Sequence, residues 1–335
     1  MKLKLILSLS LLVLLGFGYI VLKKPEQVAE ADKLSILNGE FQSLSQAFDK
    51  ETITNDPNLR FIFDYDSNYA LVGKAWEGEI AEDSEGLGGT NLYLINLNDK
   101  SEQKISDDLV SLAIFDKKNY LVYFTDISQD LWRFDIAKNS KEKIMDKVSE
   151  PDLSPDGTML VYQKLNPKWV RPYTDNSLGL TILDVKTGVE KRITNQWEDW
   201  LPFWTLDGKK IMFFSLNDAA HGMSAHYIID IDGQNKILLT NFGLYDSTQA
   251  GAVPMPSEKP VWSPDGNMLV YESDREIWIN KFNPDKTKII ESKFITRGKE
   301  PTWIRNGTAL NIVLVSENKK STESINVDLN GKIIK

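Results

Sequence analysis

Short apolar runs, each preceded by a polar turn, recur along the chain from about residue 60 onward. In the four clearest copies the apolar runs begin at Met159, Ile211, Met268 and Leu310. Each run follows a segment that starts with Pro and ends in Asp-Gly or Asn-Gly. Runs of this length, rich in Val, Ile, Tyr and Phe and bounded by turn residues, are typical of β-strands. The pattern predicts an all-β protein built from hairpins.

The turn itself has a specific chemistry. Residues 154–157 and 263–266 both read Ser-Pro-Asp-Gly. Ser suits the first position of a type I turn, Pro presets φ at the second, Asp tolerates the third, and Gly accepts a positive φ at the exit. Two weaker copies contain Asp66 and Asp116, so equivalent turn positions recur at intervals of 40 to 58 residues. Six copies are therefore predicted.

A third and a fourth short strand follow each hairpin, which gives four antiparallel strands per copy. Small sheets of this kind bury both faces only by stacking against their neighbours, as the blades of a propeller do. We expect residues 60–335 to form a six-bladed β-propeller, residues 25–59 to form a linker, a short helix or a closing strand, and residues 1–24 to form an N-terminal transmembrane or signal helix.

The repeat resembles that of a known family. Residues 260–266 read Pro-Val-Trp-Ser-Pro-Asp-Gly, an apolar strand follows, and the unit ends near Ile295-Thr296. This arrangement is similar to the WD40-like repeat of TolB-type propellers, and the similarity covers about residues 60–335. TolB itself carries an α/β domain before its propeller, for which residues 25–59 leave no room, so a Tol-Pal role is not expected.

The N-terminus predicts export. Lys2 and Lys4 precede an uncharged stretch, residues 5–22, which ends at Lys23-Lys24. This length sits at the threshold for spanning a bilayer and favours an uncleaved anchor. A cleaved signal peptide is the alternative, because Ala29-Glu30-Ala31 fits a small-x-small site. Both interpretations place the body outside the cytoplasm, either periplasmic or extracellular. An uncleaved N-terminal helix would be its only contact with the inner or cytoplasmic membrane, and a cleaved one would leave it secreted.

Charge and composition exclude several classes of partner and chemistry. The formal net charge is −9, and the first 24 residues hold four Lys and no acid, so −13 remains on the rest. Such a body repels nucleic acid. The absence of cysteine removes disulfides, thiolate metal sites, a cysteine nucleophile and a lipoprotein anchor. There is no Gly-x-Ser-x-Gly elbow, so serine peptidase activity is not expected.

Long loops and unexplained aromatic residues coincide. In a propeller, the second-to-third-strand loops and the inter-blade loops share one face, and every long insertion is predicted to fall there, on what we call the loop-rich face. Large exposed aromatics on a rigid scaffold anchor interfaces. The alternative is that these rings only pack the loops onto the blades. The candidate ligand-binding residues are Trp76, Trp169, Tyr173, Trp197, Trp200, His221, Phe242 and Tyr245.

Metal and catalytic chemistry are weaker alternatives. His221 and His226 could share a metal with Asp218, but the spacing matches no zinc pattern and His226 is expected to begin a strand. Glu198-Asp199 separates two tryptophans, and paired carboxylates beside aromatics can act on a glycan. Acidic runs are more often solvated loops. No cofactor and no catalytic residue are assigned.

These observations favour a non-catalytic binding module of the cell envelope. We expect it to hold a protein, or a polymer such as peptidoglycan or a polysaccharide, through the loop-rich face. The alternative from another class is a polysaccharide lyase or hydrolase with its site on the same face.

Overall fold

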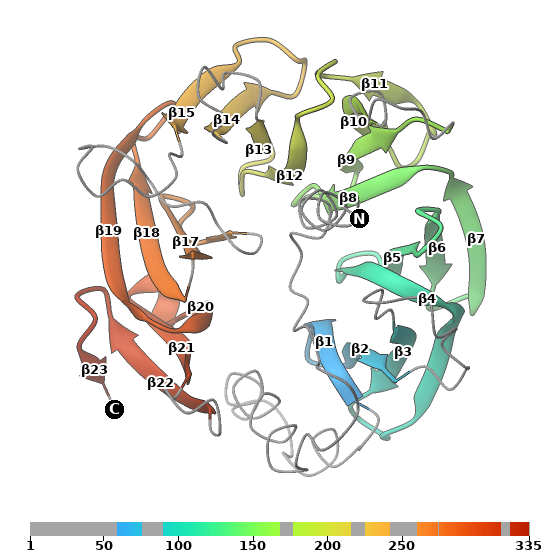
Figure 1. Cartoon of the computed structure of the whole chain (residues 1–335). Helices are drawn as coiled ribbons and strands as arrows, with labels where there is room; N and C mark the ends of the chain where they lie inside the picture. Colours follow the sequence, from blue (N-terminus) through green and yellow to red (C-terminus); the bar gives the residue numbers. More distant parts are fainter. Residues whose placement is uncertain are drawn as a thin grey trace, which may run out of the picture. The chain divides into compact units, whose positions relative to one another are not determined.

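The structure is a computed structural model that describes residues 59–75, 90–167, 177–215, 225–241, 260–273, 275–315 and 322–334. Within these ranges the chain consists of β-strands joined by turns, with one short 3-10 segment at Arg305–Gly307 (Figure 1). The all-β prediction is confirmed there. No helix among the described residues is long and apolar enough to span a membrane. The predicted N-terminal helix and residues 25–58 lie outside the described ranges.

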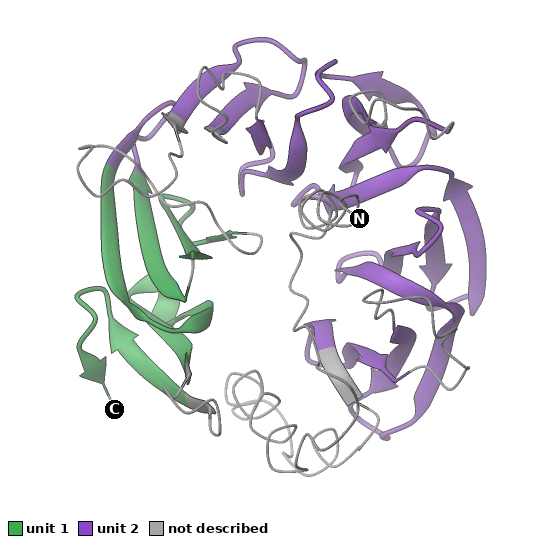
Figure 2. Cartoon of the chain, in the orientation of Figure 1, with its two compact units in different colours: residues 1–39, 255–281, 291–335 green, residues 40–254, 282–290 purple. Residues whose placement is uncertain are grey.

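The described chain forms two compact units (Figure 2). Unit 2 contains the described residues up to 241 together with residues 282–290. Unit 1 contains residues 260–281 and 291–334, with the gaps given above.

Unit 2 holds three antiparallel sheets. The first has seven strands in sequence order, and the other two have four each, in the orders β11-β10-β9-β8 and β12-β13-β14-β15. The strands of the first sheet are β1 (Leu59–Tyr65), β2 (Tyr69–Lys74), β3 (Thr90–Asn96), β4 (Glu102–Asp116), β5 (Leu121–Asp126), β6 (Leu131–Asp135) and β7 (Ser140–Met145). Those of the other two are β8 (Val148–Leu153), β9 (Met159–Leu165), β10 (Ser177–Asp184), β11 (Glu190–Arg192), β12 (Trp200–Trp204), β13 (Lys210–Ser215), β14 (Ala225–Asp230) and β15 (Ile237–Asn241).

Unit 1 holds most of one four-stranded sheet and all of another, in the orders β16-β17-β18-β19 and β20-β21-β22-β23. The turn between β18 and β19 belongs to unit 2. The strands are β16 (Val261–Trp262), β17 (Met268–Ser273), β18 (Glu276–Phe282), β19 (Ile289–Arg297), β20 (Lys299–Ile304), β21 (Ala309–Val315), β22 (Thr322–Asp328) and β23 (Ile333–Ile334).

The second strand of each predicted copy is the most deeply buried. Along β9, Leu160, Val161 and Tyr162 are consecutive and fully buried, and β13 is buried from Ile211 to Ser215. Consecutive side chains of a strand point to opposite faces, so a run buried throughout needs cover on both faces. Within unit 2, residues of β9, β10, β13 and β14 share one hydrophobic cluster, which shows that neighbouring sheets supply this cover.

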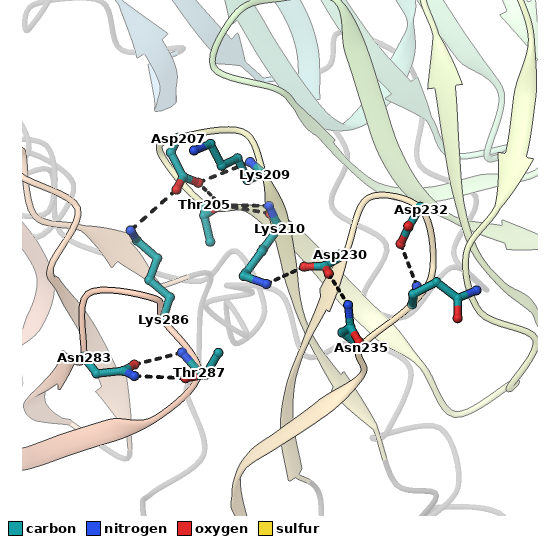
Figure 3. A network of polar contacts seen from close by, with 11 residues as sticks. Thr205, Asp207, Lys209, Lys210, Asp230, Asp232, Asn235, Asn283, Lys286 and Thr287 are labelled. Carbon is teal, nitrogen blue, oxygen red and sulfur yellow. Dashed lines mark hydrogen bonds and ion pairs between the residues drawn. The ribbon is translucent and has the colours of Figure 1, made fainter.

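The predicted hairpin turns are present and satisfy their own polar groups. The Ser154 hydroxyl donates to Asp156 at 2.7 Å and accepts from the Met159 N–H at 2.9 Å. The hydrogen bond from Ser154, together with those from the Thr158 N–H and hydroxyl, holds the pKa of Asp156 below its usual value. The same arrangement recurs at Thr205 and Asp207 (Figure 3). These Asp residues are therefore structural.

Successive turns also touch one another. A Cβ on Gly208 would lie 3.7 Å from Cδ of Pro155, within unit 2. A Cβ on Gly307 would lie 3.0 Å from Cδ of Pro264, within unit 1. In both pairs the glycine of one turn meets the proline of the copy before it.

Candidate functional site

Most of the predicted binding residues lie outside the described ranges. These are Trp76, Trp169, Tyr173, His221, Phe242 and Tyr245, together with the candidate metal ligand Asp218. The described candidates are Trp197, Trp200 and His226, and all three belong to unit 2.

Trp197 lies in the connection between β11 and β12, and Trp200 is the first residue of β12. We call residues 196–200 the acidic loop, because Glu198 and Asp199 separate the two tryptophans. Trp197 is 37% exposed. Trp200 begins β12, and its ring packs against Phe214 with 5.3 Å between ring centroids. The structure thus gives the two tryptophans different surroundings: one is available to a ligand, and the other supports the loop.

Within this loop, Asp199 is fully buried. Its backbone oxygen accepts a hydrogen bond from Gln163 Nε2 at 3.0 Å, which ties the loop to β9. Its carboxylate forms an ion pair with Lys236, with 3.8 Å between Nζ and Oδ1. The Lys236 ammonium also lies over the Tyr227 ring, 4.2 Å from its centroid. Among the described residues no donor makes a hydrogen bond to either Asp199 carboxylate oxygen or to Glu198 Oε2, although all three atoms are buried.

Glu150 is a further acid at this place that sequence reasoning missed. It lies in a bulge of β8 immediately before Pro151, with φ of 55°. Its carboxylate accepts a hydrogen bond from the backbone N–H of Leu201, at the end of the acidic loop. Burial raises the pKa of Glu150 to about 7, because the single N–H donor does not offset the loss of water around the charge.

A sequence signal for Glu150 did exist. Glu150 and Glu300 both stand directly before the proline that opens a repeat, and Leu201 holds the same position in one of the two copies between them. All three have a left-handed backbone, with φ of 55°, 51° and 48° respectively. Such a conformation is uncommon for these residue types. A residue at this bulge position is worth inspecting whenever the repeat is recognised.

The two sheets beneath the acidic loop are fastened together within unit 2. The Trp204 backbone N–H donates to Asp152 Oδ2 at 2.8 Å, and the Trp204 indole N–H donates to the Asp152 backbone oxygen at 3.1 Å. With the Glu150 and Gln163 bonds, this seam joins β8 and β9 to β12 and the loop before it. The strands that flank the acidic loop are therefore held together by hydrogen bonds. A recognition site requires rigid support of this kind.

His226 lies in the interior, next to the same seam. It is the second residue of β14, as the sequence predicted, and it is fully buried with its ring 4.2 Å from that of Phe214. Burial lowers the pKa of His226 well below its ordinary value, so the ring is neutral at physiological pH. Across the described ranges, no group of three or more His, Asp or Glu side chains is placed to hold a metal ion. The possible partners His221 and Asp218 lie outside those ranges.

The chain is similar to a curated protein over part of its length and to solved structures over most of it. No family model matches it. A curated relative, the "Uncharacterized peptidase YuxL" of Bacillus subtilis, is 27% identical over 186 residues, which is 50% of this chain and 24% of the relative. The chain thus spans about a quarter of that protein.

Two solved structures share the fold. TolB from Acinetobacter baumannii is 17% identical with a TM-score of 0.51, over 83% of this chain and 64% of that one. An oligogalacturonate lyase in complex with manganese is also 17% identical, with a TM-score of 0.56 over 80% of this chain and 73% of that one. Similarity at this level of identity shows a shared fold and does not show a shared activity. The fold of this chain is that of the TolB-like β-propellers.

Proposed function

We propose that this chain is a non-catalytic binding module of the cell envelope, a six-bladed propeller that holds its partner through the loop-rich face. The proposed blade count is supported by β4, whose 15 residues pair with β3 in their first part and with β5 in their second. Counting β4 once in each role divides the seven-stranded sheet into two blades of four strands. The other four sheets supply the remaining blades.

The proposed location rests on the N-terminal sequence. Residues 5–22 are uncharged and flanked by lysines, which suits a membrane anchor with the propeller exported beyond it. The TolB-like fold is compatible with a periplasmic setting. The partner would then be another envelope protein or an envelope polymer.

One observation carries the binding proposal: Trp197 is partly exposed on a loop that hydrogen bonds hold to the neighbouring strands. Trp197 keeps 37% of its surface exposed, while its neighbour Trp200 is packed against Phe214 and Asp199 is fully buried. Large aromatic side chains at rigid positions dominate the energetics of many interfaces. The exposed surface of Trp197 does not stabilise the folded chain, and a bound partner would bury it.

The test is quantitative capture with matched variants. Full-length protein in mild detergent is immobilised and exposed to envelope extract, and bound partners are quantified by mass spectrometry. Trp197→Ala should weaken capture of the specific partner at least tenfold. Leu206→Ala is the control, because Leu206 is 44% exposed and lies in the β12–β13 turn, on the face opposite the loop-rich one in the proposed propeller. Equal capture by both variants would contradict the proposal.

The same preparation tests the enzymatic alternative. Polygalacturonate and a panel of other glycans are incubated with the wild-type protein, and release of reducing or unsaturated ends is followed. Turnover that disappears in Glu198→Gln would replace the binding proposal with the lyase or hydrolase alternative.

A further inference from the structure

A carboxylate joins β8 to the neighbouring sheet of unit 2. Glu150 of β8 accepts a hydrogen bond from the backbone N–H of Leu201 in β12, and the two strands lie side by side (Figure 1). Both residues have a left-handed backbone, with φ of 55° and 48°. Such a conformation is uncommon outside glycine and persists only where the surrounding structure holds it. The contact between Glu150 and Leu201 is therefore a specific joint between two sheets.

The Leu201 N–H needs an acceptor outside its own sheet. In the pairing of β12 with β13 the register shifts between Trp200 and Phe203, so Leu201 falls in the irregular part of the ladder. Glu150 falls in a register shift of β8 as well. Leu201 is buried, and a buried N–H without an acceptor is costly. The Glu150 carboxylate thus fixes the start of β12 and the acidic loop that leads into it.

Glu150 is placed to change its charge without leaving the fold. As a residue it is half-buried, but protein atoms enclose its carboxylate. Burial raises the pKa of Glu150 to about 7, and the hydrogen bond from Leu201 lowers it only in part. A carboxyl in this setting titrates in the range of pH that is usual for histidine.

The elements packed most closely against β8 are β4, β9 and β12 with its acidic loop. Their charged residues, with that of β8 itself, are Glu102, Lys104, Asp107, Asp108, Asp116, Asp152, Lys164, Glu198 and Asp199. None of these described residues shifts the pKa of Glu150, which burial and the Leu201 N–H alone determine. The charge of the joint therefore depends on the proton of Glu150 itself.

Ionisation of Glu150 places an enclosed charge at the joint, and this charge regains water when the joint opens. Opening frees the start of β12 and, with it, the acidic loop that carries Trp197. We propose that Glu150 makes the attachment of the acidic loop dependent on pH, so that the loop is held when Glu150 is protonated and is released more often when Glu150 is ionised. The effect of this release on capture of a partner rests on the proposed function.

The test measures hydrogen exchange at the Leu201 amide in full-length protein in mild detergent. Peptic fragments that cover residues 199–204 are followed by mass spectrometry from pH 5 to pH 8, and the rates are corrected for the intrinsic effect of pH on exchange. The carboxyl titrates near 4.5 when the joint is open and near 7 when it is closed, so opening should become at least about tenfold more frequent over this range.

Two variants separate Glu150 from its neighbours. Glu150→Gln keeps an acceptor for the Leu201 N–H and has no charge, so its corrected exchange should change less than twofold from pH 5 to pH 8. Glu291→Gln, at an exposed residue of β19, is the matched control and should keep the wild-type response. A wild-type response in Glu150→Gln would assign the titration to another acid and overturn the inference.

Exchange in β13 distinguishes local opening from global unfolding, because this strand is buried from Ile211 to Ser215. If Leu201 exchanges at the same rate as these amides, the joint opens only with the whole fold, and the inference is overturned. If Glu150→Gln does not fold, Glu150→Ala is measured. Since Ala offers no acceptor, Leu201 should exchange at least fivefold faster than in wild type at pH 5, and a response to pH like that of wild type would again overturn the inference.

The proposed function can fail separately. Capture of the native partner is compared between wild type and Trp197→Ala at pH 6 and pH 8. If exchange at Leu201 depends on pH but Trp197→Ala captures as well as wild type, the binding function fails and the pH-dependent joint stands. If capture depends on Trp197 but exchange at Leu201 does not depend on pH, the joint fails and the binding function stands.

Discussion

Replacing Glu150 by Gln should stabilise the protein at neutral and higher pH. The Glu150 carboxylate accepts the Leu201 N–H across two sheets, and burial raises its pKa from 4.5 to about 7. Because the folded state holds the proton more tightly than the unfolded state, ionisation of Glu150 opposes folding. Its cost is absent below pH 4.5, grows between about pH 4.5 and 7, and is fully present above that range.

The free-energy cost of ionising Glu150 follows from the difference between its pKa values in the folded and unfolded states. At about 1.4 kcal/mol for each pH unit between the two pKa values, the cost reaches at most about 3 kcal/mol. A Gln side chain keeps an acceptor oxygen for the Leu201 N–H and carries no charge. Glu150→Gln should therefore be more stable than wild type by about 1 to 3 kcal/mol at pH 8, and nearly equal to it at pH 4.5.

The assay is urea unfolding of full-length protein followed by tryptophan fluorescence at pH values from 4.5 to 8. The informative quantity is the difference in unfolding free energy between variant and wild type, because the other titrating groups cancel in it. Glu291→Gln, at an exposed residue of β19, is the control and should show less than about 0.5 kcal/mol at any pH. A difference for Glu150→Gln that does not change with pH would refute the burial of an ionisable carboxyl at this seam.

Three further predictions concern packing and pairing, each checked by urea unfolding. Gly331→Ala should cost more than about 2 kcal/mol, because a Cβ would collide with a backbone carbonyl oxygen, whereas Gly188→Ala, with a similar positive φ and open space, should cost about 1 kcal/mol; equal losses would contradict the close approach. Tyr162→Phe should cost about 1.5 kcal/mol, since its hydroxyl donates to a carboxylate at 2.8 Å, and no loss would mean that this bond is replaced by water. Lys236→Met should destabilise by about 2 kcal/mol or more by leaving Asp199 buried without its ion pair, and adding Asp199→Asn should recover most of the loss; additive losses would contradict the pairing.

The parts of the fold that the sequence predicted are those whose chemistry is local. The turn at residues 154–157 forms because Ser154 and Asp156 satisfy one another and the following N–H, all within six residues. The start of β14 near His226 was predicted for the same reason, since the apolar run itself marks the strand.

What the sequence did not predict depends on contacts between sheets. Glu150 looks like an ordinary polar residue before a proline, and its hydrogen bond with the Leu201 N–H forms only when the following sheet packs beside β8. Likewise, Trp197 and Trp200 look equivalent in the sequence. They differ because Trp200 lies opposite Phe214 in the strand register, while Trp197 precedes the strand. The continuous β4 was also missed, because Asp107 and Asp108 make its middle too polar to suggest an uninterrupted strand.

The contact between successive turns has an evolutionary consequence. In Pro155 with Gly208, and in Pro264 with Gly307, the two halves of the junction come from the same motif in consecutive copies. A tandem duplication of one repeat therefore supplies a new unit with both surfaces that it needs to dock, without any compensating mutation. Where the proline is missing, as at the turn before Gly157, Asp116 and Asn119 occupy its place. In a protein that gains repeats by duplication, the long loops can therefore vary in sequence while the contacts between successive turns are kept.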